Sequence, residues 1–393
     1  MSVTLAINYD DLRRMAKRRV PRIAFDFLEG GVDDEQGLNR NSEAFSRRAL
    51  VPRYLIDASK PDQTTTLFGK TYAHPFGIAP TGGASLFRRD ADMILARAAK
   101  AANVPFIISG AATATMEEVA GVARDNSWYQ LYIARDRAIS RDMVARAAAC
   151  EFSTLVLSVD VPGQVRRERN LRNGFGRPMK PTLSAKIETL KHPAWLLEYY
   201  TGGGLTASNW IKYAAKNASA RGVLDFLATQ FPTPAVWDDV AWIRKQWKGN
   251  FVIKGIMSPD DARRAAAMGV DGLMISNHGG RQLDRSPSPL EVLPAIRDAV
   301  GEKLVVMFDS GIRRGSDIVT AMCLGAKFCF VGRWTLFGAT AGGEAGANHA
   351  LSMVSTEVAS IMTQIGASDI ANLGSQFLMW NDDADLIRNR RGP

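Results

Sequence analysis

The feature that most restricts the fold of this chain is a series of eight short apolar runs separated by longer amphipathic stretches. Short apolar runs bounded by turn residues are typical of buried parallel strands. The stretch 258–268 has Pro259 in its first turn, then acids, then bases, as the helix dipole prefers. Other expected helices are 90–102, 140–149 with Ser140 as a candidate N-cap, and 316–324. Eight strand–helix units favour a closed (β/α)8 TIM barrel, an α/β fold, over an open sheet. The expected strands are 76–79, 105–109, 128–132, 154–160, 251–255, 272–276, 304–309 and 328–332.

The connection between the fourth and fifth expected strands is far longer than the others. Connections of that length in a compact domain are usually functional or mobile. Residues 162–222 include eleven Lys or Arg and three Glu, a net charge of +8 out of +9 for the whole chain. We therefore expect a single domain over residues 1–393, with a basic and aromatic insertion at about 178–235.

Polar residues and two glycines stand at or just after the carboxyl ends of the expected strands, where enzymes with this fold place their catalytic groups. Because these ends meet at one mouth of the barrel, we expect the side chains to form one site. In chain order they are Gln130, Tyr132, Ser158, Asp160, Arg167, Lys254, Asn277, His278, Arg281, Asp309, Ser310, Gly311, Arg313, Gly332 and Arg333.

The loops after the seventh and eighth strands have the composition of a phosphate site. Gly311 and Gly332 allow close approach of the backbone, and Arg313 and Arg333 supply positive charge. Ordinary turn glycines and surface arginines are the alternative. The agreement of the two loops favours phosphate, which this fold commonly binds there.

Three groups of strand-end residues suggest catalytic or ligand-binding roles. His278 is a candidate general base, and Asp160 is placed to orient its imidazole. Arg281 and Arg167 would converge on a carboxylate, with structural salt bridges as the alternative. Lys254 ends an apolar strand, where a charge is costly unless it is used. It would form a Schiff base or place a positive charge beside a cofactor; a snorkelling lysine is the alternative.

Several other classes of site find no support in the sequence. It contains no Gly-x-Gly-x-x-Gly, Walker or His-Glu-x-x-His motif, and its four histidines are too scattered for zinc, so we expect no metal. We also expect no nucleic-acid partner. Cys150, Cys323 and Cys329 are expected to be buried thiols. The N-terminal residues lack an apolar signal core and no run of about 18 apolar residues occurs, which favours a cytoplasmic location.

The motifs resemble those of the FMN-dependent 2-hydroxy acid oxidase and dehydrogenase family. The resemblance runs from residue 10 to about 370 and rests above all on 276–284, which reads SNHGGRQLD. It also covers 20–22, 79–81, 130–132, 159–160, 253–255 and 309–315. It implies FMN as cofactor and oxidation of a small (S)-2-hydroxy acid, mandelate-like, lactate-like or a derivative, to the 2-oxo acid.

The resemblance implies a role for each matched residue. His278 matches the base that removes a proton from the substrate, and Asp160 matches its carboxylate partner. Arg167 and Arg281 match the substrate-binding arginines, and Tyr132 matches the tyrosine near the substrate hydroxyl. The residues that match flavin contacts are Thr81, Gly82, Ser109, Gln130 and Ser158 at the ring and ribityl parts, Lys254 at N1 and O2, and Asp309, Gly311, Arg313, Gly332 and Arg333 at the ribityl and phosphate parts.

One substrate contact of the family is changed in this chain. Family members usually read Tyr-Asp-Tyr where this chain has Phe25, Asp26 and Phe27. The second tyrosine donates a hydrogen bond to the substrate carboxylate, and its loss would cost about 1.5–3 kcal/mol. Either affinity is lower, or the substrate differs at that end, as with a larger or uncharged acyl group. Phe25 and Phe27 favour an aromatic substrate.

The insertion resembles the membrane-docking loop of the mandelate and lactate dehydrogenases of this family. Its sequence HPAW at 192–195 lies among basic and aromatic residues, a composition that favours anionic bilayer surfaces. A solvated lid is the alternative. Docking would place the protein peripherally on the inner face of the cell membrane and favour a quinone as electron acceptor.

Other functions remain open at this point. An oxidase that reduces oxygen to hydrogen peroxide belongs to the same family, a Schiff-base aldolase would use Lys254, and a non-catalytic barrel would need neither His278 nor Arg281. Relatives are often tetramers, which implies a homotetramer.

Overall fold

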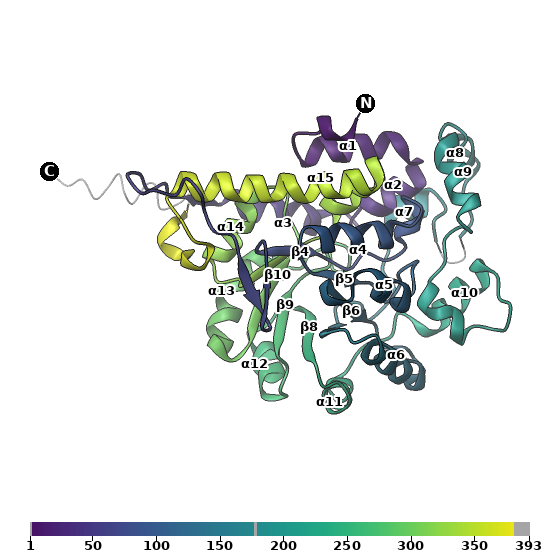
Figure 1. Ribbon diagram of the computed structural model, residues 1–393. Helices are drawn as coiled ribbons and strands as arrows, with labels where there is room; N and C mark the ends of the chain where they lie inside the picture. The colour runs from purple at the N-terminus through teal and green to yellow at the C-terminus, as the bar shows by residue number, and fades with distance from the viewer. Residues whose placement is uncertain (1, 177–178, 381–393) are drawn as a thin grey trace.

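The chain forms a closed barrel of eight parallel strands in a computed structural model that describes residues 2–176 and 179–380 (Figure 1). The last barrel strand lies beside the first and completes the circle. Each expected strand overlaps one observed strand, so the prediction of a (β/α)8 barrel is confirmed. The barrel strands are β4 (Phe76–Ile78), β5 (Phe106–Ile108), β6 (Ser127–Leu131), β7 (Thr154–Ser158), β8 (Asn250–Ile256), β9 (Gly272–Ile275), β10 (Val305–Asp309) and β11 (Phe328–Val331).

Apolar side chains from alternate strand positions fill the barrel. Trp128, Val252, Met307 and Phe330 are fully buried members of this inner cluster, which explains why the strands read as apolar runs. Full burial of one such side chain contributes about 1.5–3 kcal/mol. A hairpin of β2 (Thr65–Leu67) and β3 (Lys70–Tyr72) closes the amino-terminal end.

One helix follows each barrel strand and forms the outer layer. The expected helix 258–268 is confirmed as Pro259–Ala267, with Ser258 as its N-cap. Ser140 is not a cap, because its helix begins at Arg137 and Asp136 caps it, while the buried Ser140 Oγ accepts from Ala134 N at 2.9 Å. The helices are α4 (Ala91–Ala101), α5 (Met116–Ala123), α6 (Arg137–Ala149), α11 (Trp237–Gln246), α12 (Pro259–Ala267), α13 (Pro289–Val300), α14 (Gly315–Cys323) and α15 (Arg333–Ile365).

Segments outside the barrel cover its two sides. The amino-terminal helices are α1 (Tyr9–Arg19), α2 (Arg22–Glu29) and α3 (Gln36–Ser46), and α1 packs along α15 (Figure 1). Strands β1 (Arg48–Leu50) and β12 (Leu378–Trp380) pair near the end of the described chain. The short 3-10 helices are η1 (Val3–Leu5), η2 (Ala84–Leu86), η3 (Arg124–Asn126), η4 (Ser208–Tyr213), η5 (Gly301–Lys303), η6 (Ile370–Asn372) and η7 (Ser375–Phe377).

The long connection between β7 and β8 folds into helices of its own. They are α7 (Glu168–Arg172), α8 (Leu183–Thr189), α9 (Pro193–Thr201) and α10 (Ala220–Gln230), and α8 and α9 stand out from the barrel in Figure 1. Pro178, where the insertion was expected to begin, and Arg177 lie outside the described residues.

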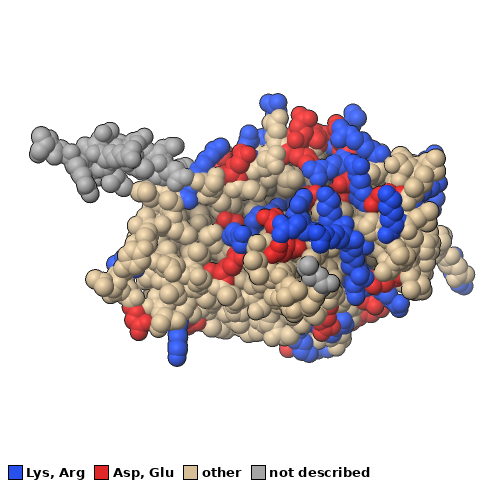
Figure 2. All heavy atoms as spheres, turned by 90° about the horizontal axis from the view of Figure 1, so that it is seen from above, with Lys and Arg blue, Asp and Glu red and all other residues tan. Residues whose placement is uncertain are grey.

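The positive charge of this connection is partly neutralised by acids from other parts of the chain. Arg169 pairs with Glu29 and Glu35, and Lys212 pairs with Asp142. Figure 2 shows Lys and Arg gathered on the upper face of the molecule, with Asp and Glu among them. The charge of 162–222 taken alone therefore overstates the field of the folded protein.

Candidate functional site

The strand-end residues meet at the carboxyl-terminal mouth of the barrel. Ser158 pairs in register with Lys254 across β7 and β8, and Asp309 ends β10. His278 and Arg281 lie in the loop after β9, and Gly332 separates β11 from α15. The barrel thus brings together the residues that the sequence predicted.

His278 and Asp160 form the pair at the centre of this mouth. His278 Nδ1 lies 3.1 Å from each Asp160 carboxylate oxygen. Burial lowers the pKa of His278, and Asp160 offsets only part of this effect. Burial alone would raise the pKa of Asp160, but His278 and Lys254 outweigh it and hold that pKa below its usual value. The arrangement is a neutral imidazole oriented by a carboxylate, with Nε2 as the ring nitrogen on the side away from Asp160.

The backbone of the loop after β9 explains its His-Gly-Gly sequence. His278, Gly279 and Gly280 all have left-handed backbone angles, with φ of 59°, 66° and 74°. A side chain at Gly280 would also collide with Leu38, since an added Cβ would lie 2.5 Å from Leu38 N. Only glycine fits these two positions, whereas His278 takes this conformation at a cost of about 1–2 kcal/mol.

Lys254 is a buried, charged lysine in a hydrogen-bonded network. Its Nζ donates to Ser276 Oγ at 2.7 Å and pairs with Asp309 Oδ2 at 3.0 Å. Burial alone would lower the pKa of Lys254, but Asp309 and Asp160 outweigh it and raise that pKa. A Schiff-base lysine needs the opposite shift. Lys254 therefore provides a fixed positive charge at the mouth.

Arg281 presents a guanidinium to the same space. Its Nη1 donates to Gly30 O at 2.6 Å, and its guanidinium lies 5.3 Å from the centre of the Phe27 ring. Arg167 lies 5.9 Å from the same ring, so the two cations converge as expected. Among the described residues, no carboxylate forms an ion pair with Arg281. Burial and then the neighbouring arginines lower its pKa, which shows that this place favours an anion.

An aromatic wall, which the sequence did not predict, continues from Phe27. The Phe27 ring lies 4.8 Å from Phe175 and 6.1 Å from Phe87, centre to centre. Leu205 of the insertion approaches the same wall, because a Cβ added at Gly83 would lie 3.3 Å from Leu205 Cδ1. These residues are scattered along the chain, and no motif marked them.

Two predicted aromatic residues have different surroundings. Tyr132 follows β6 and packs against Phe231 at 4.3 Å, and burial raises its pKa, with Asp160 adding to the effect. Phe25 does not face this mouth. It stacks on Phe337 and lies below the charged groups of Arg13 and Lys17, so its predicted part in substrate choice is wrong.

Several buried polar atoms at the mouth have capacity for further hydrogen bonds. In the described chain, Thr81 Oγ1, Gln130 Nε2 and Ser158 Oγ have no hydrogen-bond partner, although all three are inaccessible to solvent. Gln130 Oε1 accepts from Gly110 N at 3.0 Å, so its Nε2 is the amide atom left without a partner. Ser109 and Gly82 lie beside them, since a Cβ added at Gly82 would be 3.4 Å from Ser109 Oγ. Unpaired buried polar groups are costly, so this row fits a polar ligand.

The expected phosphate loops lie next to this row. Gly311 has φ of 86° and lies against Asn41, and Arg313 stacks on Tyr9 at 4.6 Å. Arg333 at the start of α15 donates to three backbone carbonyls, and burial lowers its pKa to about 10. A cavity of about 800 Å³ opens onto both arginines.

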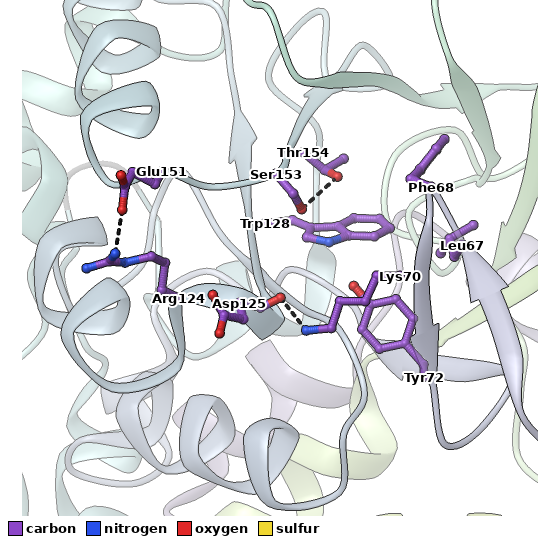
Figure 3. A pocket seen from close by; sticks show the side chains of 10 residues that line it. All are labelled: Leu67, Phe68, Lys70, Tyr72, Arg124, Asp125, Trp128, Glu151, Ser153 and Thr154. Atoms are coloured by element: carbon purple, nitrogen blue, oxygen red, sulfur yellow. Dashed lines mark hydrogen bonds and ion pairs between the residues drawn. The ribbon is translucent and has the colours of Figure 1, made fainter.

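A second hollow, of about 410 Å³, lies at the opposite end of the barrel (Figure 3). Trp128 and Tyr72 form its aromatic part. Lys70 Nζ donates to Asp125 O at 2.6 Å, and Arg124 pairs with Glu151. None of the predicted site residues lines this hollow, so the candidate site is at the other end of the barrel.

Comparisons with known proteins agree with this geometry. A profile of the family described as FMN-dependent dehydrogenase matches residues 16–380. The chain is 40% identical over 374 residues to a putative L-lactate dehydrogenase of Mycobacterium tuberculosis, covering 95% of this chain and 89% of that protein.

Two solved structures are similar over nearly the whole chain. The monotopic membrane protein (S)-mandelate dehydrogenase superposes with a TM-score of 0.92 at 35% identity, covering 96% of this chain and all of that one. A mandelate oxidase crystallised with (S)-4-hydroxymandelic acid has a TM-score of 0.82 at 34% identity, covering 95% and 98%.

Proposed function

Because this chain belongs to the FMN-dependent dehydrogenase family, whose members oxidise 2-hydroxy acids, we propose that it converts an (S)-2-hydroxy acid to the 2-oxo acid with His278 as base. The protein is therefore an FMN-dependent oxidoreductase. The observation that carries the finer proposal is the His278–Asp160 pair beside Arg281, a buried cation without a carboxylate partner among the described residues.

His278 removes a proton from the substrate. Asp160 occupies Nδ1, so the proton is taken at Nε2, and the lowered pKa of His278 keeps that nitrogen unprotonated at neutral pH. Asp160 then stabilises the imidazolium that forms. Tyr132 lies beside this pair and donates a hydrogen bond at the substrate hydroxyl.

Arg281 and Arg167 bind the substrate carboxylate. Both guanidinium groups make cation–π contacts with the Phe27 ring, which has no hydroxyl group. The two arginines therefore bind the substrate carboxylate without a hydrogen bond from a tyrosine at this position.

The row of unpaired polar atoms fits the polar edge of a flavin ring. Thr81, Gln130 and Ser158 would hydrogen-bond it, with Gly82 and Ser109 alongside, and Lys254 would place its charge at N1 and O2. Asp309, Gly311, Arg313, Gly332 and Arg333 would hold the ribityl and phosphate parts. When bound, FMN accepts the two electrons that leave the substrate.

An aromatic substrate side chain would pack against the half-buried rings of Phe27 and Phe175, and the fully buried Phe87 supports Phe27. We propose a mandelate-like acid, because aromatic rings pack well against such a wall. The central test is anaerobic bleaching of the flavin absorbance by a set of aliphatic and aromatic 2-hydroxy acids, esters and amides. Bleaching by an aromatic acid is expected, and no bleaching by any compound would overturn the function.

The role of Phe27 is tested by Phe27→Tyr. The restored phenol should lower KM for a carboxylate substrate about tenfold, as one hydrogen bond to a charged group predicts. Phe68→Tyr is the matched control, because Phe68 lines the hollow at the opposite end of the barrel and its KM should match the wild type. An unchanged KM in Phe27→Tyr would show that the substrate does not present a carboxylate there.

We propose that α8 and α9 dock on an anionic membrane surface, where a quinone accepts the electrons. Leu183 and Leu190 of this segment are 74% and 70% exposed, and Leu197 and Tyr200 of α9 are 67% and 75% exposed. The other side of α9 faces the protein, where Trp195 is buried and Glu198 is bound by Arg19 and Arg88. Apolar side chains pointing outward, with Lys186 and Lys191 between them, suit a bilayer interface better than water. No described helix has the length and apolar character needed to span a membrane.

Sedimentation with vesicles tests this docking. The protein should sediment with phosphatidylglycerol vesicles at low salt, and Leu183→Ser combined with Leu190→Ser should reduce the bound fraction. Ile7→Ser is the control, since Ile7 is an exposed apolar residue outside the insertion. Wild-type protein that stays in the supernatant would exclude docking and favour the second candidate, an oxidase that reduces oxygen to peroxide.

A further inference from the structure

The turn after α2 connects the two arginines at opposite ends of the site. Gly30 O accepts from Arg281 Nη1 at 2.6 Å and from Arg333 Nη2 at 3.1 Å. Arg333 Nε also donates to Leu28 O at 3.1 Å. One helix end therefore orients the arginine proposed for the substrate carboxylate and the arginine proposed for the flavin phosphate.

This turn is packed too closely for side chains. A Cβ at Gly30 would lie 2.7 Å from Asp26 O, and one at Gly31 would lie 2.9 Å from Gly280 O. Val32 N donates to the same Gly280 oxygen at 3.2 Å. The turn is thus fixed against the loop that carries His278 and Arg281.

Glu35 holds the turn from its other side. Its Oε1 accepts from Gly31 N at 2.9 Å, and its Oε2 pairs with Arg169. Glu35 has a left-handed φ of 62°, which is unusual for a residue other than glycine and brings its side chain back to the turn. Its negative charge also acts on Arg281, in the direction that keeps this guanidinium protonated.

We propose that Glu35 is a positioning residue for both ends of the site: by fixing the Gly30–Gly31 turn, it aligns Arg281 for the substrate carboxylate and Arg333 for the flavin phosphate. This inference rests on the proposed function, which gives those two arginines their roles. Glu35 acts through the Gly30–Gly31 turn, whose backbone carbonyl at Gly30 accepts from both arginines.

The test compares Glu35→Ala and Glu35→Gln as purified holoenzymes. FMN dissociation is measured by the fluorescence of released flavin, and oxalate, a dianion, is titrated by its effect on the flavin absorbance. Loss of a hydrogen bond between a charged carboxylate and the turn should weaken FMN and oxalate about tenfold each in Glu35→Ala. Glu35→Gln, which keeps an acceptor for Gly31 N, should show a smaller loss. At saturating substrate, kcat should change less than KM.

Glu29→Gln is the matched control. Glu29 pairs with the same Arg169 at 3.1 Å but accepts nothing from Gly30 or Gly31. Removing its negative charge, which also acts on Arg333, does not disfavour a phosphate, so neither FMN nor oxalate should bind more weakly than in the wild type. The proposal is overturned if Glu35→Ala behaves like Glu29→Gln, or if only one of the two ligands is weakened. The thermal unfolding midpoint of each variant is also measured. A variant that binds weakly but unfolds at the wild-type midpoint has misaligned arginines and an intact fold. FMN release is measured without substrate, so it tests the Arg333 part even if no 2-hydroxy acid proves to be oxidised.

Discussion

At the scale of single residues, His278 combines a strained backbone conformation with a side chain whose pKa is lowered. The left-handed φ of 59° brings Nδ1 to Asp160, and burial keeps the ring neutral. A residue in a sparsely populated conformation at a strand end, paired with a buried carboxylate, is a common sign of catalysis.

His278→Gln should lower kcat by a factor of about 10²–10⁴, the usual contribution of a general base. Oxalate binding should persist, because Arg281 and Arg167 are untouched. Stopped-flow reduction of the flavin measures the first effect and absorbance titration measures the second. A variant that reduces its flavin at the wild-type rate would exclude His278 as the base.

The pH dependence of kcat/KM should reflect the lowered pKa of His278. The base acts when it is unprotonated, so kcat/KM should rise with pH to a plateau. The midpoint of this rise should lie below 6.5, the ordinary pKa of histidine. Asp160→Asn removes the carboxylate that partly raises this pKa, so the midpoint should move to still lower pH while the plateau falls. A midpoint above 6.5 in the wild type would contradict the assignment.

The sequence was sufficient to place the strand-end residues, because a buried strand appears in the sequence as a short apolar run and the polar residues that follow it mark its end. It was not sufficient for Glu35 or Phe175, which reach the site through packing of distant segments. Gly30 contributes through its carbonyl oxygen, and every residue type has one.

At the scale of elements, the insertion could be located from its length and charge but not oriented. The structure shows which face of α9 packs on the protein, because Trp195 Nε1 on that face donates to Leu86 O at 2.7 Å. Helix α6 shows a similar limit, since both Asp136 and Ser140 are good capping residues and only tertiary packing selects between them.

Trp195→Phe should loosen the insertion while leaving the barrel intact. The ring would still stack on Tyr199, but the hydrogen bond, worth about 1 kcal/mol, would be lost. Limited trypsin digestion should then cut faster within the insertion. Trp237→Phe, in α11, is the control and should be cut at the wild-type rate.

At the scale of the whole molecule, the chain presents an apolar loop that suits self-association. Tyr54, Leu55 and Ile56 are consecutive exposed residues, and Leu55 has a left-handed φ of 63°. We propose that residues 1–393 act as one domain and that this loop contributes to the homotetramer expected from the sequence.

Light scattering after size exclusion should therefore give a mass well above the 42.9 kDa of one chain. Leu55→Asp should shift the mass downward, because a buried unpaired charge is costly at an apolar contact. A wild-type mass of one chain would contradict the tetramer.

The junction between the α2 turn, Arg281 and Arg333 has a consequence for biosynthesis. Arg281 and Arg333 lie 251 and 303 residues after Gly30 along the chain, and α1 packs against α15, which is translated near the end. A nascent chain on the ribosome can fold its early strands, but the proposed flavin site lacks the phosphate-binding Arg333 until that residue has emerged. We therefore expect FMN to bind only after synthesis is nearly finished, so that chains ending before α15 carry no flavin absorbance when they are isolated on ribosomes.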